Sequence, residues 1–163
     1  MPIEIYQVAE DLPGALFIMP RPMPELGDSM AALRTLGLDK VVSMLPADEA
    51  QALGLQYEAA CCNAAGMAFT THPITDFGLP DPAIFDPFAC QIGAELRRGS
   101  RIAIHCRAGI GRSGMAVAAA LITLGWNAVQ AVERVSERRG VSIPDTDDQR
   151  RFLADFELRQ RHG

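Results

Sequence analysis

The residues with the clearest chemical capability lie in one run, from His105 to Gly114, which reads His-Cys-Arg-Ala-Gly-Ile-Gly-Arg-Ser-Gly. The run follows the apolar segment Arg101–His105, which predicts a short buried strand. Glycines let a loop turn its N–H groups inward, and the start of the next helix adds the positive end of its dipole. We therefore expect a cradle for an anion such as phosphate, formed by Arg107, Ala108, Gly109, Ile110, Gly111 and Arg112.

Cys106 and Arg112 belong to the same predicted cradle. The guanidinium group of an arginine can donate two parallel hydrogen bonds to two phosphate oxygens. The dipoles and charge that favour a bound phosphate also favour the thiolate of Cys106, and a thiolate beside an oxyanion site is a nucleophile. Ser113 can donate a hydrogen bond to that sulfur, which would help the thiolate to leave in a later step.

Three other interpretations of this run are weaker. The spacing Gly109-x-Gly111-x-x-Gly114 fits a dinucleotide-binding loop, but no second strand follows to present an acidic residue. A nucleotide P-loop would need Gly-Lys followed by Ser or Thr, which the chain lacks. In the third interpretation, Cys106 is an ordinary core residue and Arg112 is a surface charge. That interpretation does not explain the glycine pattern between them.

The pattern His-Cys-x5-Arg-Ser resembles the signature of the cysteine-dependent protein tyrosine phosphatase superfamily. Upstream, the run from Pro73 to Asp81 is similar to the general-acid loop of the kinase-associated phosphatase group of small dual-specificity enzymes. The resemblance implies that Cys106 forms a phosphocysteine intermediate and that Asp76 protonates the leaving oxygen. It also implies a reaction that needs neither a metal ion nor another cofactor.

Two further residues gain supporting roles from this resemblance. His105 precedes the nucleophile and is expected to orient the loop rather than to act as a base. Gln149 resembles a glutamine that positions water in some relatives, although it also fits an exposed position on a helix. Asp81 stands before Pro82, so we interpret it as a helix cap rather than as the acid.

The elements that must position these residues alternate early in the chain, and helices dominate late. This order predicts a single α/β domain over residues 1–163, with a mostly parallel sheet of four to five strands flanked by helices. The expected strands are Ala15–Met19, Lys40–Leu45, Met67–Thr71 and Arg101–His105. Helices are expected from 28 or 29 to 36, from 46 to 65 with a break at 54, from 82 to 99, from the turn at 109–114 to 124, from 127 to 139, and from 145 or 146 to 160.

Composition excludes several other classes of protein. The chain has 163 residues, 48% of them hydrophobic, which is too apolar for a disordered protein. A net charge of −5 argues against a nucleic-acid binder. The N-terminal residues lack an export signal, and no apolar run approaches the roughly 18 residues of a membrane span, so we expect a cytoplasmic protein without stable membrane insertion.

The cysteines other than Cys106 show no pattern of metal ligands. Cys61, Cys62 and Cys90 are expected to be small buried hydrophobic residues without structural disulfides. Pairing of Cys61 or Cys62 with an oxidised Cys106 stays open, because sequence does not give their distance from it.

The substrate class is narrowed but not fixed. Ile74-Thr75-Asp76 replaces the Trp-Pro-Asp of longer tyrosine-specific relatives, which implies a shallow pocket that admits phosphotyrosine and also phosphoserine or phosphothreonine in proteins or peptides. A phosphoinositide or other non-protein phosphate is the alternative, although the predicted cradle contains no lysine. A phospho-binding scaffold without turnover is the other alternative. The oligomeric state stays open.

Overall fold

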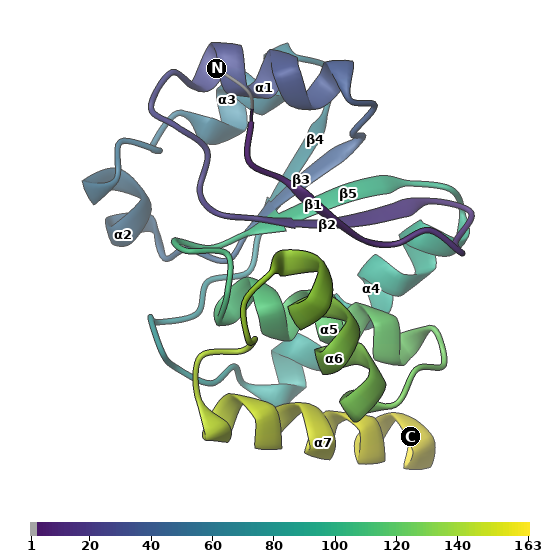
Figure 1. Cartoon of the computed structure of the whole chain (residues 1–163). Helices are drawn as coiled ribbons and strands as arrows, with labels where there is room; N and C mark the ends of the chain where they lie inside the picture. The colour runs from purple at the N-terminus through teal and green to yellow at the C-terminus, as the bar shows by residue number, and fades with distance from the viewer. Residues whose placement is uncertain (1–2) are drawn as a thin grey trace.

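A five-stranded sheet runs through the middle of the molecule in the computed structural model, which describes residues 3–163 (Figure 1). The strands lie in the order β1-β2-β5-β3-β4, and only the β1–β2 pair is antiparallel. The expectation of a mostly parallel sheet of four to five strands is therefore confirmed. The strands are β1 (Tyr6–Ala9), β2 (Ala15–Met19), β3 (Lys40–Ser43), β4 (Ala68–Thr71) and β5 (Arg101–His105).

Strand β5 lies at the centre of the sheet, and its last residue marks the edge where the chemistry gathers. His105 pairs with Met19 of β2 on one side and with Ser43 of β3 on the other. These parallel strands thus end at one edge, and ligand sites of open parallel sheets lie at the carboxyl ends of their strands. Cys106 is the first residue beyond that edge.

Helices cover both faces of the sheet (Figure 1). On one side lie α1 (Leu26–Thr35) and α3 (Glu58–Ala64), and on the other side α5 (Arg112–Thr123) packs against the sheet among three further helices. Every residue of α5 from Arg112 to Ile122 is buried, as expected for a helix that is apolar on all sides. The remaining helices are α2 (Ala47–Ala52), α4 (Pro82–Arg97), α6 (Ala128–Arg139) and α7 (Asp147–His162).

Helix termini agree with the sequence where a side chain caps them. Asp81, Asn127 and Thr146 accept hydrogen bonds from backbone N–H groups at the starts of α4, α6 and α7. The break predicted at Gly54 separates α2 from α3. Helix α1 begins at Leu26, two or three residues before the predicted start, and neither Asp28 nor Ser29 caps it.

Two sequence predictions were wrong or incomplete. Strand β1 was not predicted, because it is a short edge strand that pairs, within residues 3–163, with β2 alone, and its first two residues are only half-buried. Cys62 is buried and Cys61 is half-buried, but Cys90 is exposed. Cys90 falls outside the buried stripe of α4 formed by Phe85, Ala89 and Ile92, so helical periodicity turns it toward solvent.

Neither a membrane span nor a metal cluster is found in the part of the chain that the structure describes. Over residues 3–163 no helix is long and apolar enough to cross a bilayer. The same residues contain no group of three or more His, Cys, Asp or Glu side chains arranged to hold a metal ion.

The contact between α4 and α5 gives a first prediction. A Cβ atom at Gly93 would overlap Thr123 Oγ1, whose hydroxyl group donates to Ala120 O at 2.6 Å. Gly93→Ala should therefore lower the free energy of unfolding by about 1–3 kcal/mol, even though alanine is the better helix former by about 1 kcal/mol. Urea denaturation measures the change.

The double variant Gly93→Ala/Thr123→Ala tests the cause of that loss. Because the second substitution removes the oxygen that the new methyl group meets, most of the lost stability should return, relative to Thr123→Ala alone. A single variant as stable as the wild type, or a double variant with no recovery, would contradict this close packing.

Candidate active site

The cradle predicted between β5 and α5 is closely packed against neighbouring backbone. Gly109 has a φ of +73°, and a Cβ atom there would lie 2.6 Å from the carbonyl group of Met19. No other residue fits this position, because both the left-handed conformation and the missing side chain are required. The close approach of the loop to the end of β2 thus depends on glycine at this position.

The N-terminus of α5 has no side-chain cap, in contrast to α4, α6 and α7. Its first N–H groups therefore remain available to an external acceptor. Cys106 lies beside this terminus with only 3% of its surface exposed, and its Sγ is 3.1 Å from Ser113 Oγ. The structure thus brings together an uncapped helix start, a recessed thiol group and a hydroxyl group that can bond the sulfur.

Arg112 is almost wholly buried, and its guanidinium group joins three parts of the chain. Two nitrogens donate to the two carboxylate oxygens of Glu49 in α2, at 2.7 and 2.9 Å. One of them also donates to the backbone oxygen of Ile74, at 2.9 Å, and the other lies 3.2 Å from Asp76 Oδ1. Burial works to lower the pKa of Arg112, but the bond to Glu49 and the charges of Cys106, Glu49 and Asp76 outweigh it and keep that pKa raised.

Asp76 sits in a turn at the mouth of the site. The turn is closed by Gly78 N, which donates to Thr75 O at 2.7 Å, and Ile74 N donates to Met44 O beyond β3. The side chain of Asp76 is 39% exposed. A carboxyl group at this place can reach both solvent and the cradle, as a group that exchanges protons with a substrate must.

His105 lies below the cradle and is completely buried. Its Nε2 is 2.6 Å from Glu58 Oε2, and its Nδ1 is 3.1 Å from the backbone oxygen of Cys106. Both ring nitrogens of His105 thus lie against oxygens, one of a side chain and one of the backbone. The Glu58–His105 pair holds the backbone of Cys106 to helix α3.

Arg139 holds the outer side of the cradle. Its Nε donates to Gly109 O at 3.1 Å, and its Nη2 donates to Ala108 O at 3.0 Å. Two carbonyl groups that point outward to a guanidinium group leave the intervening backbone free to turn N–H groups inward. On the opposite rim, Arg21 N donates to Arg107 O at 3.1 Å.

Gln149 is fully buried, so the alternative of an exposed helical position was wrong. Its Oε1 accepts from Asp145 N and Thr146 N, at 3.0 and 3.2 Å, and its Nε2 donates to Gly78 O at 3.2 Å. Asp145 itself lies against Gly111, where a Cβ atom would overlap its Oδ2. Burial and the charge of Asp76 raise the pKa of Asp145, while Arg112 opposes the shift.

Four residues of the site were not singled out from the sequence as functional: Glu49, Glu58, Arg139 and Asp145. Glu49 follows strand β3, so a search of every segment beyond a parallel strand would have reached it. Asp145 marked only one of two possible starts of the last predicted helix, and the residue that caps α7 is Thr146. No pattern among neighbouring residues points to a role for Glu58 or Arg139, because their hydrogen-bond partners lie 47 and about 30 positions away in the sequence.

The other thiol groups are not arranged as nucleophiles. Cys62 donates to Ala68 O at 3.3 Å, and burial raises its pKa to about 11. Cys61, Cys62, Cys90 and Cys106 are all free. The high pKa of Cys62 disfavours the thiolate that would have to attack an oxidised Cys106.

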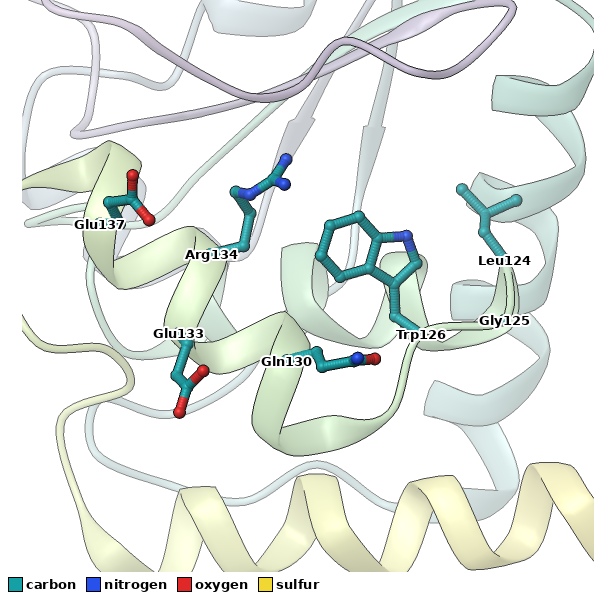
Figure 2. A pocket seen from close by; sticks show the side chains of 7 residues that line it. All are labelled: Leu124, Gly125, Trp126, Gln130, Glu133, Arg134 and Glu137. Carbon is teal, nitrogen blue, oxygen red and sulfur yellow. The ribbon is translucent and has the colours of Figure 1, made fainter.

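A separate surface hollow of about 610 Å³ lies at the start of α6 (Figure 2). Trp126 and Arg134 stand on its wall, with the guanidinium carbon 4.9 Å from the centre of the indole ring. No residue of the cradle lines it, so we assign it no part in the chemistry.

Comparisons with known proteins agree with the geometry. The family model described as "Polymorphic toxin system, DSP-PTPase phosphatase" matches residues 19–126. A "Probable protein tyrosine phosphatase type IVA A" of Dictyostelium discoideum is 38% identical over 89 residues, which cover 53% of this chain and 54% of that protein. The match thus spans about half the length of that curated relative.

Two solved structures show the same fold. Kinase associated phosphatase, with its catalytic cysteine replaced by serine, has a TM-score of 0.88 at 20% identity, over 100% of this chain and 98% of that one. PTPMT1 in complex with PI(5)P has a TM-score of 0.79 at 19% identity, over 97% of each chain. The expectation of a dual-specificity phosphatase-like α/β fold is confirmed.

His72, which precedes the turn of Asp76, gives a prediction about pH. It stacks on Phe88 at 4.3 Å between ring centres, and burial lowers its pKa below 6.5. The unfolded chain therefore takes up this proton at a higher pH than the folded chain does. Stability should fall as the pH drops below 6.5, by at most about 1.4 kcal/mol per pH unit from this group. Urea unfolding at pH 7.5 and 5.5 measures the loss.

His72→Phe keeps an aromatic ring stacked on Phe88 and removes the imidazole group that takes up the proton. Its stability should change less between the two pH values than that of the wild type, because the other titrating groups are common to both. Equal changes in the two proteins would show that His72 does not contribute to the acid sensitivity.

The two hydrogen bonds from Arg139 to the cradle, called here the Arg139 clamp, give a prediction about anion binding. Arg139→Met removes both hydrogen bonds to the cradle, so inorganic phosphate should bind about tenfold more weakly, measured by calorimetry. Arg138→Met is the matched control, because Arg138 lies next to it on α6 and pairs with Glu10 instead. Equal affinities of the two variants would contradict the clamp.

Proposed function

Because this chain belongs to the family of DSP-PTPase phosphatases of polymorphic toxin systems, we propose that it hydrolyses phosphomonoesters through a phosphocysteine intermediate on Cys106. One observation carries the proposal. The recessed sulfur of Cys106 lies 3.1 Å from Ser113 Oγ at an uncapped helix start, under a buried arginine that Glu49 holds in place. An anion site that contains its own nucleophile suits the transfer of a phosphoryl group.

In the first step, the thiolate of Cys106 attacks phosphorus in line with the leaving oxygen. The N–H groups of residues 107–112 and the guanidinium group of Arg112 bind the three equatorial oxygens, over which transition-state charge is spread. Asp76 enters protonated and gives its proton to the departing alcohol or phenol.

In the second step, water attacks phosphorus, one of its protons passes to a carboxylate of the site, and the P–S bond breaks. The electron pair returns to sulfur, where the hydroxyl group of Ser113 can donate a hydrogen bond to the forming thiolate. Arg112 and the loop hold the same oxygens as before. Neither proposed step requires a metal ion or cofactor.

We infer that the substrates are phosphorylated proteins or peptides, with phosphotyrosine first and phosphoserine or phosphothreonine next. Asp76 is 39% exposed, which supports a mouth open enough for either kind of side chain. A phosphoinositide is the alternative, and the PTPMT1 structure shows that this fold can hold PI(5)P. The one lysine of the chain, Lys40, pairs with Glu95 at the other end of β3, so it offers no second phosphate site beside the cradle.

We also infer that residues 1–163 act as one domain in the cytoplasm. The residues that build the site are spread from Met19 to Gln149, which supports one domain rather than two. Four free thiol groups support a reducing compartment.

Hydrolysis of an aryl phosphate in the presence of a metal chelator tests the proposal. The wild type should release the phenol, and Cys106→Ser should reduce the rate to background, because serine at this place is not ionised. Cys90→Ser, on the exposed face of α4, is the matched control and should keep full activity. Phosphopeptides and a phosphoinositide are then compared as substrates.

Activity that survives in Cys106→Ser, or that the chelator abolishes in the wild type, would overturn the mechanism. A reduced wild type that binds phosphopeptides without turnover would instead be a phospho-binding scaffold.

A further inference from the structure

We propose that Asp145 is a second catalytic carboxylate of this site and that it takes the proton of the water that hydrolyses the phosphocysteine. The inference rests on the proposed function, and it divides the two steps between two carboxylates. Asp76 would serve the first step as acid, and Asp145 would serve the second as base.

The position of Asp145 is the first argument. The residue lies between α6 and α7, immediately before the capping residue Thr146. Its Oδ2 packs on Gly111 in the place that a side chain at 111 would fill. A glycine at that point of the cradle therefore lets a carboxylate reach the loop that binds the phosphoryl group.

The hydrogen bonds of Gln149 are the second argument. Both ends of its amide group are engaged by backbone, with Oε1 on Asp145 N and Thr146 N and Nε2 on Gly78 O. Gln149 therefore has little capacity left to orient a water molecule. It fixes the backbone of Asp145 and joins that backbone to the turn that carries Asp76, so it is a positioning residue.

The unequal pairing of the two carboxylates is the third argument. Asp76 lies 3.2 Å from the guanidinium group of Arg112, whereas the side chain of Asp145 makes no hydrogen bond or ion pair within residues 3–163. Partial burial and the charge of Asp76 raise the pKa of Asp145, so its carboxylate accepts a proton more readily than an ordinary aspartate does.

The proposed step balances. The water oxygen bonds to phosphorus while the P–S bond breaks and leaves its electron pair on Cys106. One hydrogen of the water moves to Asp145, and the other stays on the product hydrogen phosphate. Asp145 then returns its proton to solvent, and Asp76 regains one before the next turnover.

Stopped-flow kinetics with an aryl phosphate separate the two steps. The parameter kcat/KM covers events up to the formation of phosphocysteine, whereas a slow second step lowers kcat alone. Asp145→Asn should keep kcat/KM within about twofold of the wild type and lower kcat roughly 10- to 100-fold. The first turnover should then appear as a burst close to one phenol per enzyme.

Two further variants test whether the effect is specific to the carboxylate of Asp145. Asp148→Asn, at the second residue of α7, where Asp148 pairs with Arg151 on the surface, should behave like the wild type. In Asp145→Ala, added formate should restore part of kcat, because a small carboxylate can replace the missing base. Thermal melts verify that all three variants fold.

Two outcomes would overturn the inference: an unchanged kcat in Asp145→Asn, or an equal fall of kcat and kcat/KM. An inactive wild type would instead refute the proposed function, so the two failures are distinguishable within one experiment.

Discussion

The buried guanidinium group of Arg112 is the constraint on which the rest of the site depends. A buried charge is costly unless it is paired and hydrogen-bonded, so the fold must bring acceptors to it. It receives a carboxylate from α2 through Glu49, together with a backbone oxygen and a second carboxylate from the turn that carries Asp76. Segments that are distant in sequence are thereby held around one positive group, and that group faces the cradle.

The sheet explains why these segments can meet. Strands β2, β5 and β3 run parallel and end together, at Met19, His105 and Ser43. The chain leaves each strand at the same edge, so the first loop presses on Gly109, the second becomes the cradle, and the third leads to Glu49. Helix α5 begins in the middle of this edge, and its buried position fixes where its uncapped N-terminus points.

The sequence alone predicts the local parts of this arrangement but not the long-range ones. The run from His105 to Gly114 combines strand, glycine loop and helix start in adjacent residues, so the cradle, Cys106 and Ser113 were recognisable. Arg139 lies on a different helix, about 30 positions away, yet it donates to two carbonyl groups of the cradle. Gln149 was expected to position a water molecule, but its amide group is hydrogen-bonded to the backbone. The carboxylate of the nearby Asp145 faces the cradle instead. These pairings are set by how the helices pack, which no local pattern records.

The central claim is that the phosphoryl group passes through the sulfur of Cys106. The most direct test is to mix the reduced protein with an aryl phosphate, quench it rapidly in acid, and locate any phosphoryl group by mass spectrometry of its peptides. The account predicts one phosphoryl group, on the peptide that contains Cys106 and bonded to its sulfur. Turnover with no phosphorylated peptide, or with the group on another residue, would contradict it.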